Sequence, residues 1–290
     1  MALHPIGVSG LGRMGGAIAA NLVKNGHTVR GFDPKESAQQ ALTQAGGTPV
    51  TLEELATACP VIFFALPAVS DLEDDLAVIK AHAKPGTILV ECSTFPVEDK
   101  LRLNNDLADT GIIMLDAPLS GTGAQAKTGD ITVFVSGDQT AAEQVAPLIA
   151  DFSRSQDYLG AFGNGMKMKC AANLMVAIHN VAAAEGMLLA TRSGLPAQMA
   201  YDVLSKSGAT SRILEVRGPM MVEEVFTPPS FTAKLMMKDL GLIADAVKAN
   251  GLCAPLFDAA AEIHREASIS HPEEDTASVY AVLADKVKNC

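Results

Sequence analysis

Residues 4–33 read HPIGVSGLGRMGGAIAANLVKNGHTVRGFD, and this stretch decides the fold. The short apolar run at its start predicts a buried strand, and the run from Gly16 to Asn25 predicts a helix. A second apolar run predicts another strand, which ends at Asp33. The order of strand, glycine-rich turn, helix, strand and acid is the fingerprint of a dinucleotide-binding unit.

The glycine-rich turn is Gly10-Leu11-Gly12-Arg13-Met14-Gly15. In such a turn, Gly10 permits the tight bend, Gly12 lets the backbone approach the pyrophosphate, and Gly15 lets the helix pack close to the strand. The free N–H groups and positive dipole end of the helix favour phosphate at the same place. We therefore expect all six residues to line a cofactor site.

Asp33 follows Gly10 at close to the ~20-residue spacing at which an acid accepts hydrogen bonds from the adenosine ribose. A carboxylate at this position repels a 2′-phosphate, which favours NAD over NADP. Lys35 lies close enough in sequence to meet a 2′-phosphate, so NADP stays open as an alternative. We expect NAD as the cofactor.

Strand and helix patterns continue to alternate as far as Asp116. Repeated units of this length predict an α/β fold of the Rossmann type, a doubly wound parallel sheet that binds ligands at the C-terminal ends of its strands. Leu66-Pro67 and Ser93-Thr94 follow two of the expected strands. By position alone they are either ligand contacts or ordinary loop residues. We take Leu66, Pro67 and Thr94 as candidate cofactor contacts.

A turn of small residues, Ser120-Gly121-Thr122, follows the last of these strands. Its hydroxyls and backbone N–H groups can cradle a carboxylate. The composition fits a substrate-binding turn and a hairpin loop equally well.

From Gly163 onward the strand patterns disappear, and apolar runs separated by Gly and Pro predict only helices. The first run, residues 163–192, is rich in Ala, Leu and Met and lacks Pro, which predicts one long helix. We expect a Rossmann domain over residues 1–162 and an all-α domain over residues 163–290, joined by this long interdomain helix.

Lys169, Asn173 and Asn180 fall on one face of the long helix at about 100° per residue. Polar side chains that recur this regularly would be costly in the hydrocarbon core of a membrane. A buried helix of a soluble protein is therefore favoured over a membrane span. If burial lowers the pKa of Lys169 from ~10.4 toward neutrality, its amine can exchange a proton with a substrate hydroxyl. Lys167 points to nearly the opposite side of the helix.

Composition limits the class of protein. The chain has 290 residues, 48% hydrophobic and 19% charged, which is typical of a globular protein with a sizeable core. A net charge of −11 argues against nucleic acid as a partner. The cysteines show no metal-binding spacing, and no export segment precedes the first strand, so we expect reduced thiols, no metal site and a cytoplasmic location. The cysteines are Cys59, Cys92, Cys170, Cys253 and Cys290.

The chain contains four motifs: GLGRMG at 10–15, DAPLSG at 116–121, GNGMKMKCAAN at 163–173 and KDL at 238–240. In order and spacing they resemble those of the beta-hydroxyacid dehydrogenase family. That family contains 3-hydroxyisobutyrate dehydrogenase, tartronate semialdehyde reductase and glyoxylate/succinic semialdehyde reductase, and is related to 6-phosphogluconate dehydrogenase. Thr122 stands where the family usually has a second glycine, which leaves the substrate open, and Ala172 stands where the first of two asparagines is usual.

The resemblance implies an NAD(P)-dependent oxidoreductase that transfers hydride between nicotinamide and a short 3-hydroxy acid or its semialdehyde. It implies Lys169 as general acid and base, with Asn173 one helical turn away, and Lys238 as a cofactor contact. It also implies that Ser120, Gly121 and Thr122 hold the substrate carboxylate. The helical domain is expected to form a homodimer or homotetramer.

Two other readings stay open at this point. Imine reductases resemble this chain but have Asp or Tyr where Lys169 stands, and some relatives are catalytically silent NAD-binding interaction proteins that lack the lysine. Arg212 and Arg217 either recognise a second acid or a phosphate on the substrate or lie on the surface.

Overall fold

The structure is a computed structural model that describes residues 4–288; Cys290 lies outside this range. The chain divides into two compact units, one that ends at Lys169 and one that begins at Cys170. Since both residues belong to one helix, the division falls inside an element of secondary structure.

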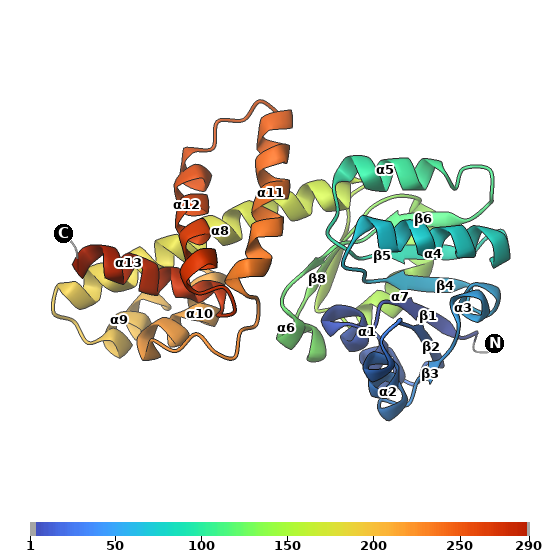
Figure 1. The fold of residues 1–290 in the computed structure, drawn as a ribbon, viewed down its shortest axis with the longest axis horizontal. Helices are drawn as coiled ribbons and strands as arrows, with labels where there is room; N and C mark the ends of the chain where they lie inside the picture. The colour runs from blue at the N-terminus through green and yellow to red at the C-terminus, as the bar shows by residue number, and fades with distance from the viewer. Residues whose placement is uncertain (1–3, 289–290) are drawn as a thin grey trace. The chain divides into compact units, whose positions relative to one another are not determined.

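The first unit contains a six-stranded parallel sheet with the strand order β3-β2-β1-β4-β5-β6 (Figure 1). In this order the chain reverses direction across the sheet between β1 and β4, as in the doubly wound dinucleotide-binding fold. The expected Rossmann-type sheet is therefore confirmed. The strands are Ile6–Ser9 (β1), Val29–Phe32 (β2), Thr48–Pro49 (β3), Val61–Phe64 (β4), Ile88–Glu91 (β5) and Ile113–Asp116 (β6).

Helices cover both faces of this sheet because its strands bury side chains on both. In β4, Phe63 packs in one core with α1, α2 and α7, whereas Ile62 and Phe64 pack in a second core with α3, α4 and α5. Successive residues of a strand point to opposite faces, which accounts for the alternation. The helices are Arg13–Lys24 (α1), Glu36–Gln44 (α2), Leu52–Ala58 (α3), Val69–His82 (α4), Val97–Asn105 (α5) and Gln139–Ala150 (α7).

A smaller mixed sheet, β7-β8-β9, follows β6. β7 is antiparallel to β8, β9 is parallel to it, and a bridge between Asp116 and Ser136 links the end of β6 to the end of β8. The sequence pattern did not predict β9, because its residues, SQDY, are polar and mostly exposed at an edge. The elements are Leu119–Ser120 (β7), Gly123–Lys127 (α6), Thr132–Val135 (β8) and Ser155–Tyr158 (β9).

Only helices follow β9 in the part of the chain that the structure describes, as expected. Within that part, α8 alone is long and apolar enough to cross a membrane by length and composition, a test that the core helix of a soluble protein also passes. Its apolar side chains pack in the core of the second unit with α9, α10, α12 and α13. The helices are Asn164–Arg192 (α8), Ala197–Leu204 (α9), Arg212–Glu223 (α10), Ala233–Ala249 (α11), Pro255–Ser270 (α12), Thr276–Ser278 (η1) and Val279–Lys288 (α13).

Candidate functional site

The glycine-rich turn has the geometry that a dinucleotide needs. Gly10 has a φ of +83°, and a side chain on Gly15 would meet the carbonyl oxygen of Gly10 at 1.8 Å, so α1 can start this close to β1 only with glycine there. A side chain on Gly12 would meet nothing within 4 Å, which leaves open space on the outer side of the turn. Gly12 is the N-cap residue of α1, and having no side chain it leaves the first N–H groups of the helix open to a phosphate.

Asp33 lies directly after β2 and is buried. Its Oδ2 accepts a hydrogen bond from the N–H of Leu11 at 2.8 Å, and its Oδ1 accepts one from the N–H of Lys35 at 2.8 Å. Each carboxylate oxygen has a second lone pair, so the group can still accept from a ribose hydroxyl. The acid is thus fixed in orientation beside the glycine-rich turn, and these residues fit a dinucleotide.

The ends of β4 and β5 are tied together by Ser93. Its Oγ accepts a hydrogen bond from the N–H of Leu66 at 2.9 Å, and its own N–H donates to Oε1 of Glu91 at 2.7 Å. Pro67 is exposed beside Leu66, and Thr94 is half-buried. The three candidate contacts Leu66, Pro67 and Thr94 therefore lie at the same edge of the sheet as the glycine-rich turn.

The Ser120–Thr122 turn is part of a short hairpin and a helix start. Ser120 pairs with Thr132 across β7 and β8, and a side chain on Gly121 would meet Ile131 at 2.5 Å. Thr122 is the N-cap of α6: its Oγ1 accepts from the N–H of Gln125, and its own N–H donates to Gln125 Oε1 at 3.0 Å. The capping box thus engages both polar groups of Thr122.

The turn is held beside the glycine-rich segment through α6. Asn21 of α1 donates a hydrogen bond from Nδ2 to the carbonyl of Ala126 at 2.8 Å. A side chain on Gly123 would meet the Cβ of Arg13 at 3.3 Å, so the starts of α6 and α1 are in close contact. The candidate substrate turn therefore leads into a helix that contacts the helix of the glycine-rich turn.

The polar face of α8 is buried, as its periodicity predicts. Lys169 is 7% exposed, whereas Lys167 is exposed and donates a hydrogen bond from Nζ to Oδ1 of Asn164 at 3.1 Å. Asn173 donates from Nδ2 to Oδ2 of Asp239 at 2.9 Å. Asp239 comes from α11, next to Lys238, which is exposed. Sequence reasoning considered Asp239 only as the neighbour of Lys238, and did not predict Asn173 as its partner.

Sequence reasoning quoted Asp116 and Gly165 only as parts of motifs and missed Lys100, and it assigned none of them to the start of α8. Oδ2 of Asp116 accepts a hydrogen bond from the N–H of Met166 at 2.8 Å, and Oδ1 of Asp116 accepts one from Nζ of Lys100 at 2.7 Å. A side chain on Gly165 would meet the carbonyl oxygen of Phe134 at 2.4 Å, so a glycine is needed for this approach. The sequence signal that could have identified Lys100 is its position: it follows the buried strand β5 and lies in α5, where most other residues are half-buried or exposed.

Arg212 and Arg217, whose roles the sequence left undecided, lie in different environments. Arg217 is buried, and its Nε donates to Oδ1 of Asp275 at 2.9 Å. Arg212 is exposed and forms an ion pair with Glu215 at 3.1 Å. Arg217 therefore takes part in the core of the second unit, where Asp275 also accepts hydrogen bonds from Ser230 and Phe231.

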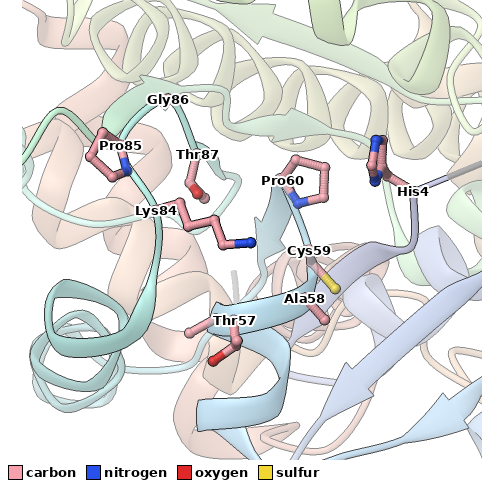
Figure 2. A pocket seen from close by; sticks show the side chains of 10 residues that line it. His4, Thr57, Ala58, Cys59, Pro60, Lys84, Pro85, Gly86 and Thr87 are labelled. Carbon is pink, nitrogen blue, oxygen red and sulfur yellow. The ribbon is translucent and has the colours of Figure 1, made fainter. Parts of the chain in front are cut away.

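A pocket of about 230 Å³ lies at the opposite end of the sheet, before the strands begin (Figure 2). His4 precedes β1, Cys59 precedes β4, and Lys84 and Thr87 precede β5. Burial raises the pKa of the Cys59 thiol to about 11, so this thiol is protonated and a poor nucleophile. Because doubly wound sheets bind ligands at the carboxyl ends of their strands, this pocket is separate from the candidate site.

Comparison with known proteins agrees with this architecture. Residues 5–163 match the NAD binding domain of 6-phosphogluconate dehydrogenase, and residues 163–283 match the NAD-binding family of NADP-dependent 3-hydroxyisobutyrate dehydrogenase. A probable 3-hydroxyisobutyrate dehydrogenase of Mycobacterium tuberculosis is 33% identical over 284 residues, 94% of this chain and 96% of the relative. An NAD-dependent L-serine dehydrogenase of Pseudomonas aeruginosa is 32% identical over 274 residues, 91% of this chain and 92% of the relative.

The fold agrees with a solved structure over the same extent. The 3-hydroxyisobutyrate dehydrogenase of Mycobacterium tuberculosis, solved with L-serine, has a TM-score of 0.88 at 30% identity and covers 97% of this chain and 99% of its own. An imine reductase of Streptomyces aurantiacus is more distant, with a TM-score of 0.60, 16% identity and coverage of 96% of this chain and 99% of its own, and shares the fold alone.

The fold, the glycine-rich turn and these matches define an oxidoreductase that transfers hydride with NAD or NADP. Within that class, the chain belongs to the beta-hydroxyacid dehydrogenase family.

Proposed function

We propose that this enzyme interconverts a short 3-hydroxy acid and its semialdehyde, with Lys169 as the general acid and base. The observation that carries the proposal is the burial of Lys169 on the polar face of α8 while Lys167, two residues earlier, is exposed. A nicotinamide cofactor, when bound, would supply the hydride chemistry. Lys169 supplies what that chemistry needs from the protein, a proton at the substrate oxygen.

An amine at position 169 can serve both directions of the reaction. Lys169 is buried, and in its neutral form the amine can take the hydroxyl proton during oxidation. In reduction, the protonated amine gives a proton to the carbonyl oxygen. Asn173 lies one turn further along α8, where its hydrogen bond to Asp239 fixes the amide. We assign Asn173 to hold the substrate or Lys169.

The substrate carboxylate is assigned to the turn of Ser120 and Gly121. The helix that follows this turn contacts α1, and Gly121 itself is exposed and has no side chain to cover the turn. The capping box engages Thr122, so its contribution is to fix the turn through Gln125. The names of the relatives, 3-hydroxyisobutyrate and L-serine dehydrogenases, support a small hydroxyacid as substrate.

NAD is the proposed cofactor, because the fixed carboxylate of Asp33 disfavours a 2′-phosphate. The contacts assigned to the cofactor are those of the glycine-rich turn, Asp33, Leu66, Pro67, Thr94 and Lys238.

Assembly and location are further parts of the proposal. We assign the Rossmann domain, residues 1–162, to cofactor binding, with Lys238 as an added contact from the helical domain. The helical domain, residues 163–290, is assigned to substrate binding and to dimer or tetramer formation. We further propose that the protein is cytoplasmic. Large apolar side chains of the second unit support the assignment of dimer or tetramer formation: Leu189 is 72% exposed, Leu256 69% and Ile269 79%. Sedimentation velocity on the full chain measures the oligomeric state.

The experiment is the oxidation of 3-hydroxyisobutyrate and L-serine with NAD⁺ and NADP⁺ by the wild-type chain, Lys169→Ala and Lys167→Ala. We expect Lys169→Ala to lower kcat by about 10²- to 10⁴-fold, the range for loss of a general acid or base. Lys167→Ala serves as the matched control and should keep kcat. NADH binding should persist in both variants, and it can be followed by NADH fluorescence without tryptophan background, since the chain has no Trp.

The opposite result would reject the assignment. If Lys167→Ala loses turnover and Lys169→Ala keeps it, the proton is transferred elsewhere. Turnover of cyclic imines instead of hydroxyacids by the wild-type chain would also reject the proposed substrate class.

A further inference from the structure

A fully buried ionic cluster lies at the carboxyl ends of β5 and β6, outside the roles assigned so far. Nζ of Lys100 is 2.5 Å from Oε2 of Glu91 and 2.7 Å from Oδ1 of Asp116, and all three side chains have no exposed surface. Burial lowers the pKa of Lys100, but the two adjacent carboxylates outweigh this effect and raise it, so the lysine stays charged. Three buried charges are costly unless each is paired and hydrogen-bonded.

The remaining oxygen of Asp116 is directed at the start of α8. Oδ2 accepts hydrogen bonds from the N–H of Met166 at 2.8 Å and from Oγ of Ser136 at 3.1 Å. Oγ of Ser136 in turn accepts from the N–H of Gly165 at 2.9 Å. Two of the unpaired N–H groups at the helix start are thus satisfied by a carboxylate and hydroxyl from other elements, and the negative charge lies at the positive end of the helix dipole.

The other carboxylate holds the loop that follows β5. Oε1 of Glu91 accepts the N–H of Ser93 at 2.7 Å, and Ser93 accepts the N–H of Leu66. Lys100 therefore links the ends of β5 and β6. Through these two strand ends it also links the loop after β5, on the cofactor side, to the first turn of α8.

We propose that Lys100 and Asp116 are positioning residues for Lys169. Met166 precedes Lys169 by three residues, about one helical turn. A hydrogen bond that fixes the N–H of Met166 therefore also fixes the position of Lys169 along the axis of α8 and its orientation about that axis. Lys100 orients Asp116, and Asp116 anchors α8. This inference rests on the proposed function of Lys169.

The test compares Asp116→Asn, Lys100→Met and Lys100→Arg in the full chain. Asparagine keeps the shape of Asp116 but cannot accept from both Lys100 and Met166. Lys100→Arg keeps the charge, and it covers the case in which Lys100→Met fails to fold with two unpaired carboxylates. Asp75→Asn is the matched control, because Asp75 is a buried carboxylate of the same unit that bonds Ser9 and has no hydrogen bond to α8.

Kinetic and exchange measurements give separate readouts. For Asp116→Asn we expect kcat to fall by about 10- to 100-fold, the scale for a misplacement of about 1 Å, with an altered pH profile of kcat and with NADH affinity unchanged. Lys100→Arg should keep most of kcat. Amide hydrogen exchange over residues 164–169 should become faster in Asp116→Asn and stay at the wild-type rate in Asp75→Asn.

Each other outcome has a defined meaning. A lower Tm of Asp116→Asn with unchanged kcat and unchanged pH profile would overturn the proposal, since the cluster would then act on stability alone. If the wild-type chain oxidises no hydroxyacid, the proposed function fails, and positioning for that reaction fails with it. Faster exchange at residues 164–169 in Asp116→Asn would then still identify the anchor of α8.

Discussion

Asp33 performs two tasks with one carboxylate. It orders the glycine-rich turn by accepting the N–H of Leu11. We propose that its remaining lone pairs accept hydrogen bonds from the adenosine ribose. Because both oxygens accept backbone N–H groups, its orientation does not depend on the ligand. The preference for NAD over NADP should therefore depend on the charge of Asp33 more than on the mobility of its side chain.

We predict that Asp33→Asn shifts the preference toward NADP. Asparagine can still accept the N–H of Leu11, but the repulsion of a 2′-phosphate is lost. The ratio of kcat/KM with NADP⁺ to that with NAD⁺ should rise by about 10- to 100-fold, since two like charges near a surface interact by a few kcal/mol. Steady-state kinetics with both coenzymes measure the ratio.

Glu36→Gln is the control for this prediction, because Glu36 is an exposed carboxylate three residues further on, in the first turn of α2. An equal shift in Glu36→Gln and Asp33→Asn would mean that net charge near the site, and not contact with the ribose, sets the preference.

At the scale of the element, α8 contains two glycines with opposite surroundings. A side chain on Gly165 would meet three oxygen atoms, of Phe134 and Asp116, at 2.4 to 2.9 Å, whereas a side chain on Gly186 would meet nothing within 4 Å. The first glycine is required by the approach of the helix to β6 and β8. The second carries only the entropic cost of glycine in a helix.

We predict effects of opposite sign for Gly165→Ala and Gly186→Ala. The first should destabilise the chain by about 1–3 kcal/mol, the usual range for overpacking, and the second should stabilise it by about 0.5–1 kcal/mol. Urea unfolding followed by circular dichroism measures both. A neutral Gly165→Ala would show that α8 can shift away from β6 at low cost, and would weaken the case for an anchored helix start.

The elements that the sequence predicted well are those with local signals. The polar face of α8 follows from 3.6-residue periodicity, and the glycine-rich turn follows from spacing. β9 is polar along its length and forms only because β8 lies beside it. The cluster of Lys100, Glu91 and Asp116 joins separate elements, and no periodicity encodes such partners.

At the scale of the whole molecule, each unit contains a buried group that titrates between pH 3 and 7. Burial lowers the pKa of His264, in the second unit, to about 4. Burial also raises the pKa of Asp75, in the first unit, to about 6, with a smaller opposing effect of the hydrogen bond from Ser9. In their folded states, His264 binds protons less readily than in the unfolded chain and Asp75 binds them more readily.

These shifts give opposite pH dependences of stability. Between about pH 6.5 and 4 the unfolded chain takes up the proton of His264 first, so stability from this group is lost as the pH falls. Asp75 stabilises the fold most below about pH 3.8, and this contribution is lost as the pH rises through about 6. Over the shared range the two effects partly cancel.

We predict that single variants will separate the contributions of His264 and Asp75 to the pH dependence of the free energy of unfolding. Relative to the wild-type chain, His264→Gln should lose less stability from pH 6.5 to 4.5, and Asp75→Asn should lose more, by an order of 1–3 kcal/mol each. Urea unfolding at several pH values measures the difference, with circular dichroism as the signal. Parallel pH profiles for both variants and the wild-type chain would contradict the prediction.

The division between the two units inside α8 restricts how the chain length can change. A loop absorbs an inserted residue, but a helix turns by about 100° for each one, so a single insertion between Lys169 and Asn173 would carry every later side chain of α8 to a new face. Lys169 would keep its anchor, while Asn173 would leave Asp239 and Asn180 would leave the carbonyl of Thr276. Recombination between relatives at this boundary must therefore preserve helical phase, and length variation is tolerable only in the loops on either side.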